Sequence, residues 1–207
     1  MSKPAAALSH TGPKDYQGAK LGMWIFLFTE LLLFGGLFIL YSSYRAIYAQ
    51  DFHEGGRHLN VVLGVVNTVF LLTSSLTVAV SISALRKGNR RLTLQCLGAT
   101  IVLGVLFLAN KYVEWSEEIR RGIYPNGPEL EKLPNGEKIF YGLYYSMTGL
   151  HGLHVLAGVV VLTVMLAFVI KNRVTATDYV KLENAGLYWH LVDVIWIFLL
   201  PMLYLAA

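Results

Sequence analysis

The fold of this chain is decided by the stretch Trp189-His190-Leu191-Val192-Asp193-Val194-Ile195-Trp196-Ile197-Phe198-Leu199-Leu200. The run is apolar enough to enter a membrane, yet it contains a histidine and an aspartate. A charged side chain at the bilayer centre costs roughly 2.5–3.5 kcal/mol on insertion scales. A second acid, Glu30, lies inside an equally apolar run at residues 23–34. Two acids at depth on two different spans therefore need a partner from the protein, the lipid or another subunit.

The composition identifies a membrane protein. Of the 207 residues, 55% are hydrophobic and 14% are charged, whereas soluble domains have about 25% charged residues. A membrane span needs about 20 mostly apolar residues. We therefore predict an all-α, polytopic membrane bundle, with a polar segment at 1–20 followed by a single transmembrane domain at 21–207. Its five expected spans are residues 21–44, 59–84, 92–113, 140–170 and 182–206.

The charge distribution predicts the orientation of these spans. With five crossings, the N-terminus and the loops near residues 86–91 and 171–181 lie on one side of the membrane, and they hold ten of the 17 Lys and Arg residues. The positive-inside rule then places the N-terminus in the cytoplasm and the C-terminus outside. Residues 1–20 lack the apolar centre of a signal peptide, so we expect an uncleaved first span. The single cysteine, Cys96, excludes an intrachain disulfide and a cysteine-based metal cluster.

The polar residues at depth form two pairs on single helices. His190 and Asp193 are three residues apart and share a helix face, and so do His151 and His154. We expect one polar seam between the fourth and fifth spans, with Glu30 near it or on a separate face. His151, His154 or another subunit could be the partner of Glu30.

Three interpretations of these residues compete. A metal site gains little support, because the sequence lacks a Glu-x-x-His pair and a multi-histidine box. A haem needs histidine ligands on facing helices, and the sequence offers only one cross-helix pair, so a haem site gains little support as well. We favour a structural network of hydrogen bonds that contacts lipid or a partner helix, with a proton relay at Glu30 or Asp193 left open. We predict no catalytic, cofactor-binding or metal-ligating residue in this chain, and we interpret Lys111 and Glu114 as a solvated helix end.

Four passages resemble subunit III of the haem–copper oxidases, the cytochrome c and quinol oxidases of respiratory chains. Residues 22–30 resemble the helix of that family with a buried carboxylate, and residues 111–115 resemble its Glu-aromatic helix end. The passage at 148–158 is close to its Thr-Gly-x-His-Gly-x-His-Val signature, and that at 189–196 to its last-helix signature. The signature residues in this numbering are Glu114, Thr148, Gly149, Gly152, Trp189 and Trp196.

The resemblance implies a non-catalytic membrane subunit that protects the catalytic subunit I during turnover and supports proton uptake. Haem and copper are then expected in partner subunits and not in this chain, with phospholipid as a further ligand. The whole assembly reduces oxygen to water and pumps protons, and a bacterial cytoplasmic membrane is the expected location. Many family members have seven spans, so the five spans here resemble the short form.

Several alternatives stay open from the sequence. The electron donor binds other subunits, so cytochrome c is the first choice, ahead of a quinol. The third candidate, from the same family, is an accessory protein of a nitric oxide reductase. A stand-alone transporter or lipid-binding membrane protein is the alternative from a different class.

Overall fold

The computed structural model describes residues 16–205, and within them the regular structure is helical. Five helices are long and apolar enough to cross a membrane, which confirms the predicted fold class. The helices in chain order are α1 Tyr16–Ile47, α2 Ala49–Arg57, α3 Val61–Arg86, α4 Arg90–Arg120, η1 Leu130–Lys132, α5 Asn135–Ile170, α6 Val180–Leu200 and the π-helical turn η2 Pro201–Leu205.

The helices differ from the predicted spans mainly at the end where the C-terminus lies. The segment after the first span, expected to be an external turn, folds as the short helix α2. Helix α4 continues to Arg120, seven residues past the predicted span at 92–113. Most of the polar segment predicted at 1–20 lies outside the described residues, and Tyr16 to Lys20 belong to α1.

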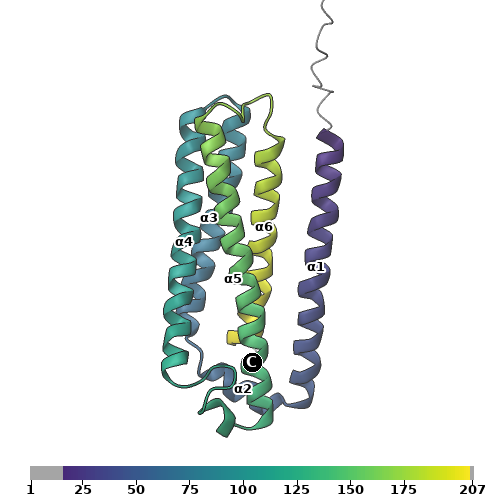
Figure 1. The fold of residues 1–207 in the computed structure, drawn as a ribbon, viewed down its shortest axis with the longest axis vertical. Helices are drawn as coiled ribbons and strands as arrows, with labels where there is room; N and C mark the ends of the chain where they lie inside the picture. Colours follow the sequence, from purple (N-terminus) through teal and green to yellow (C-terminus); the bar gives the residue numbers. More distant parts are fainter. Residues whose placement is uncertain (1–15, 206–207) are drawn as a thin grey trace, which may run out of the picture.

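Four of the spans form a bundle, and α1 stands beside it. Figure 1 shows α3, α4, α5 and α6 side by side, with α1 at the right. Helix α6 is the most buried span and α1 the least. Helix α1 buries only Leu27, Phe34 and Tyr41, which are spaced seven residues apart and therefore form one narrow stripe. Most of the apolar surface of α1 is consequently exposed.

The α3–α4 connection is a tight turn that its sequence explains. Gly88 has φ +76°, a left-handed conformation that glycine adopts without strain. The next residue, Asn89, caps α4, because its side chain accepts a hydrogen bond from the backbone N–H of Leu92 at 3.1 Å. Arg90 then donates to the carbonyl of Ile170 at 2.6 Å. This end of α5 is thereby held to the start of α4.

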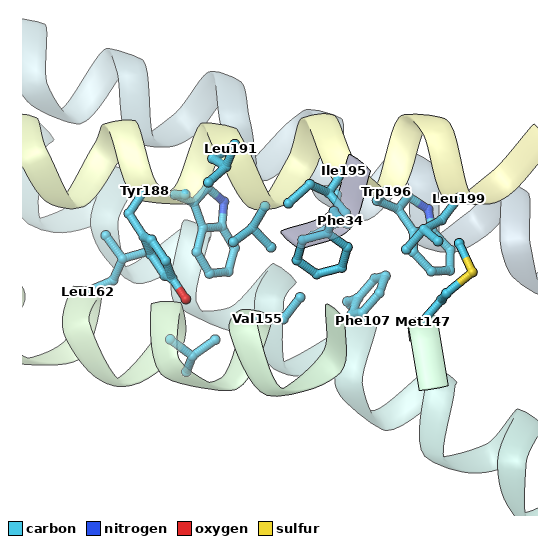
Figure 2. Packing of buried hydrophobic residues seen from close by; sticks show 14 of the residues in the cluster. Phe34, Phe107, Met147, Val155, Leu162, Tyr188, Leu191, Ile195, Trp196 and Leu199 are labelled. Atoms are coloured by element: carbon cyan, nitrogen blue, oxygen red, sulfur yellow. The ribbon is translucent and has the colours of Figure 1, made fainter. Parts of the chain in front are cut away.

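The core lies where α6 meets α4 and α5 (Figure 2). Trp189 of α6 is fully buried, and its ring occupies space left by two glycines. A Cβ atom at Gly104 of α4 or at Gly158 of α5 would lie 2.7 Å from that ring. Small residues let helices approach closely in membranes, where the hydrophobic effect does not drive helix association. These two glycines therefore set the spacing between α6 and its neighbours.

Candidate functional site: buried polar contacts between the helices

Glu30 and His154 form a pair that joins α1 to α5. The Oε2 atom of Glu30 lies 2.9 Å from Nε2 of His154, and the two side chains are 15% and 16% exposed. The Nδ1 atom of His154 lies 2.8 Å from the carbonyl oxygen of Leu150. A carbonyl oxygen only accepts, so Nδ1 carries a proton, and Nε2 faces the carboxyl group of Glu30.

The surroundings of this pair fix the position of the imidazole. Phe34, one turn after Glu30 on α1, packs its ring edge against His154 with centroids 5.3 Å apart. Tyr188 of α6 donates a hydrogen bond to the backbone carbonyl of His154 at 3.1 Å. The contact therefore involves α1, α5 and α6. It provides a polar attachment for α1, whose buried side chains form one narrow stripe.

His151 lies elsewhere, although it is three residues from His154 on the same helix. Its side chain is fully buried and stacks on Trp196 of α6 with centroids 5.2 Å apart. Phe107 of α4 contacts the same imidazole edge-on at 5.5 Å. Within residues 16–205, neither ring nitrogen of His151 has a hydrogen-bond partner. His151 acts here as a flat core side chain between α4 and α6.

His190 and Asp193 make different contacts as well. Nδ1 of His190 lies 2.6 Å from the hydroxyl of Ser75 on α3, which links α6 to α3. Asp193 is 3% exposed and lies beside the Ser75 hydroxyl, but within residues 16–205 neither of its carboxyl oxygens makes a hydrogen bond of ordinary geometry. The single seam expected between the fourth and fifth spans is therefore divided into separate contacts. Glu30 pairs with His154, His190 with Ser75, and His151 with aromatic rings.

Sequence reasoning did not identify the polar side chains of α3 as contacts, yet they form several hydrogen bonds with α6 and α4. The indole N–H of Trp189 donates to the hydroxyl of Ser74 at 2.9 Å, and that of Trp196 donates to Thr68 at 3.0 Å. On another face, Thr77 pairs with Thr100 of α4 at 2.8 Å. The hydroxyl side chains in this apolar helix could have indicated these contacts, because in hydrocarbon such groups form hydrogen bonds with neighbouring helices.

The remaining signature residues lie on the face of α5 near α4. Thr148 is buried and its hydroxyl donates to the carbonyl of Tyr144 at 2.6 Å. A Cβ atom at Gly149 would contact the ring of Trp115 at 3.1 Å, whereas one at Gly152 would meet nothing within 4 Å. Gly149 therefore allows close packing, and Gly152 lies in open space in this chain.

The interpretation of Lys111 and Glu114 as a solvated helix end is wrong. They are 5% and 3% exposed and form a salt bridge of 3.0 Å. The hydroxyls of Tyr144 and Tyr204 each donate to the same Oε1 atom of Glu114 at 2.5 Å. Lys111 also donates to the Tyr204 hydroxyl at 2.5 Å and lies over the ring of Trp196 at 5.6 Å.

This buried cluster, formed by Lys111, Glu114, Tyr144 and Tyr204, connects three elements. It ties the end of α4 to α5 and to the π-helical turn η2, which brings Tyr204 back into the bundle. The second carboxyl oxygen of Glu114 is buried and has no partner within residues 16–205. A Lys and a Glu three residues apart after an apolar stretch could have indicated a buried ion pair. Because they lie near the end of a predicted span, they were interpreted as solvated.

Ligand-holding features are few among the described residues. No group of three or more His, Cys, Asp or Glu side chains that could hold a metal is found between residues 16 and 205. An apolar groove of about 520 Å³ lies between α1, α5 and α6, and its lining includes Phe26, Val161 and Lys181. A groove with a cation at one end has the chemistry that a phospholipid requires.

Comparisons with known proteins agree with the signature passages. Residues 3–207 match the family model described as "Cytochrome c oxidase subunit III". A cytochrome c oxidase subunit 3 of Synechocystis is 31% identical, with 98% of this chain and 81% of that protein covered. The cytochrome c oxidase subunit 3 of Alkalihalophilus pseudofirmus is 33% identical over 90% of this chain and 86% of its own length. A cytochrome bo(3) ubiquinol oxidase subunit 3 of Pseudomonas putida is 29% identical over 90% and 85%.

Proposed function

This chain belongs to the cytochrome c oxidase subunit III family and is a subunit III of a haem–copper oxidase, and on that premise we propose that it is the non-redox subunit that stabilises the catalytic subunit I. It is an integral, multi-pass membrane protein and a member of an oxidoreductase complex. The proposed role is to protect subunit I during turnover and to support proton uptake. Oxygen reduction and proton pumping would be carried out by the assembly.

One observation carries the proposal that this chain has no redox centre of its own. Its histidines at depth are used one by one in contacts between helices: His154 with Glu30, His151 with Trp196, and His190 with Ser75. A haem or a metal needs several donors that converge on one point. Side chains that hold separate helices together suit a scaffold subunit, with haem and copper in its partners.

We further propose the orientation and the location of the chain. The start of α1, the α3–α4 turn and the α5–α6 connection lie at one end of the bundle (Figure 1). These segments carry the excess of Lys and Arg, which favours a cytoplasmic position. The N-terminus would then be cytoplasmic and the C-terminus outside, in a bacterial cytoplasmic membrane. The segmentation into a polar stretch at 1–20 and one transmembrane domain at 21–207 belongs to the same proposal.

Cytochrome c is the electron donor that we propose for the assembly. Two of the three relatives described above are named as cytochrome c oxidase subunits. A quinol is the second candidate, because a ubiquinol oxidase subunit is similar over nearly the same length. Steady-state oxygen consumption by the purified complex, with reduced cytochrome c or with a quinol, separates the two.

The role in protecting subunit I is tested by removing this chain from the complex. Oxidase prepared with and without it should start at comparable rates of oxygen consumption. The preparation without the chain should then inactivate after fewer turnovers and show slower proton uptake. Equal lifetimes and equal proton uptake in both preparations would refute the proposed role.

A further inference from the structure

One face of α6 is only partly covered by the other helices of this chain: two of its residues are exposed and the rest are half-buried. Leu187, His190, Val194, Ile197 and Pro201 recur every three or four residues, so they lie along one side of the helix. Val194 and Ile197 are 42% and 43% exposed, and His190 in their midst is partly exposed. A stripe of apolar residues facing hydrocarbon is ordinary, but an imidazole within such a stripe is not.

His190 has hydrogen-bonding capacity that this chain leaves unused. Its Nδ1 atom is occupied by Ser75 at 2.6 Å. Within residues 16–205, Nε2 makes no hydrogen bond, and the residue is not fully buried. Lipid tails offer neither donor nor acceptor, so a polar atom facing them remains unsatisfied. Whichever tautomer is present, Nε2 needs a partner: an acceptor if it carries the proton and a donor if it does not.

Helix α1 forms a second wall beside this stripe. Near the end of the membrane where the C-terminus lies, Ser42 and Arg45 of α1 and Pro201 line a cavity of about 440 Å³. At the opposite end, Lys20 of α1 and Glu183 of α6 form a salt bridge of 2.9 Å. We call the surface between these two ends the α1–α6 trough, formed by the exposed stripe of α6 and the adjoining side of α1.

The length of the trough matches the thickness of the membrane. Glu183 and Pro201 are separated by about 27 Å along a helix axis, close to the ~30 Å thickness of the hydrocarbon core. Charged residues mark both ends, where lipid headgroups or water lie, and the stripe between them is apolar except at His190. A lipid chain would fill the apolar parts but would leave Nε2 of His190 without a partner.

We propose that the α1–α6 trough is the docking surface for a transmembrane helix of a partner subunit, which places a hydroxyl or amide side chain against Nε2 of His190. This inference rests on the proposed function, because it assumes that the chain works inside an oxidase complex. Hydroxyls and amides both donate and accept, so they satisfy either tautomer of His190. The docked helix would also cover Val194 and Ile197.

Photo-crosslinking in the native membrane tests the docking surface directly. The photoreactive residue p-benzoyl-L-phenylalanine replaces Val194 in the trough, or Val160 on the outer face of α5, which is 56% exposed. After illumination, the tagged chain is purified and its adducts are identified by mass spectrometry. We expect the Val194 variant to capture a polypeptide of the haem-bearing complex well above the level at Val160. Adducts with lipid alone, or equal capture at both positions, would overturn the proposal.

The same preparation distinguishes failure of this inference from failure of the proposed function. If haem-bearing subunits co-purify with the chain but Val194 captures only lipid, the docking surface is wrong and the proposed function stands. If no haem-bearing subunit co-purifies with the unmodified chain, both are wrong.

Substitutions at the two ends of the Ser75–His190 contact test the role of Nε2. Ser75→Ala removes the inner hydrogen bond and leaves Nε2 in place, whereas His190→Phe keeps a ring and removes Nε2. We expect His190→Phe to lower retention of the chain in detergent-washed complex about threefold, the effect of one typical membrane hydrogen bond. Ser75→Ala and His190→Gln should retain the chain. Equal losses for Ser75→Ala and His190→Phe would show that His190 only holds α6 to α3, and would overturn the proposal.

Discussion

Oε2 of Glu30 on α1 lies 2.9 Å from Nε2 of His154 on α5, while the second nitrogen of the same imidazole faces the carbonyl oxygen of Leu150 at 2.8 Å. This contact is one of several polar attachments of the helix that packs least against the bundle, beside the Lys20–Glu183 salt bridge and the hydrogen bond from Tyr41 to the carbonyl of Met202. The acid that sequence reasoning identified as costly is therefore compensated within this chain.

The pair predicts a measurable coupling between its two members. Glu30→Ala should destabilise the purified chain by about 1 kcal/mol, and the double variant Glu30→Ala/His154→Ala should lose less than the sum of the single variants. The coupling energy should be about 0.6–1.7 kcal/mol, the range for hydrogen bonds between membrane helices. Unfolding in a detergent series measures all four proteins. Glu30→Gln, whose amide can donate to Nε2 of His154, is the control that should stay near wild type. Additive losses would refute the pairing.

The buried cluster predicts a contrast between two Lys–Glu pairs of identical spacing. Lys111 and Glu114 are buried, whereas Lys132 and Glu129 are exposed and form a salt bridge of 2.7 Å. Lys111→Met should destabilise the chain by about 3–5 kcal/mol, because it strands a buried carboxylate. Lys132→Met should cost less than about 1 kcal/mol. Thermal denaturation of the two variants makes the comparison, and similar melting temperatures would contradict the cluster.

A second variant separates charge from packing in this cluster. Lys111→Met combined with Glu114→Gln removes both charges and keeps the side-chain volumes similar. The double variant should recover much of the stability that Lys111→Met loses, since replacing a buried pair is far less costly than breaking it. No recovery would mean that the tyrosines and not the charge pair hold η2 in place.

The glycine contacts of Trp189 predict opposite outcomes for two substitutions on the same helix. Gly158→Ala places a Cβ atom 2.7 Å from the indole of Trp189 and should destabilise the chain by about 1–3 kcal/mol through overpacking. Gly152→Ala meets nothing within 4 Å and should be neutral or mildly stabilising, because alanine is the better helix former. Thermal unfolding of the isolated chain measures both. Equal effects would show that α5 and α6 do not pack at this distance.

We expect the chain to tolerate replacement of the buried acid Asp193 by an apolar residue. Its oxygens make no hydrogen bond among residues 16–205, so the free energy lost when this carboxyl group leaves water is not compensated by a hydrogen bond. Asp193→Leu should leave the stability of the isolated chain unchanged or raise it by about 1 kcal/mol. His190→Leu should lower it, since it breaks the bond to Ser75. A larger loss for Asp193→Leu than for His190→Leu, measured by thermal unfolding, would reveal a partner of Asp193.

The number of spans and their approximate positions could be predicted from the sequence, because hydropathy and charge report directly on the membrane. The contacts between helices could not. Ser74, Ser75 and Thr68 carry little hydropathy signal, so their role in binding α6 is not visible in a linear pattern. Spacing along one helix likewise does not indicate which neighbour a side chain faces. His151 and His154 both contact α6, but His151 also packs against Phe107 of α4, whereas His154 pairs with Glu30 of α1.

The errors at the helix ends have a related physical cause. Lys111 lies near the predicted end of a span, where long basic side chains usually reach the membrane surface. Here α4 continues to Arg120, and two tyrosines from distant elements provide the partners that allow the charge pair to be buried. The partner Tyr204 is 93 residues away in the sequence. No local pattern around Lys111 could have indicated it.

We propose that this chain is a scaffold subunit of a haem–copper oxidase and carries no redox centre of its own. The most direct measurement is the optical spectrum and metal content of the tagged complex, recorded before and after this chain is released from it by detergent. We predict haem absorption and stoichiometric iron and copper in the intact complex and in the fraction without this chain, and a colourless, metal-free released chain. A Soret band, or stoichiometric iron or copper, that stays with the released chain would contradict the account.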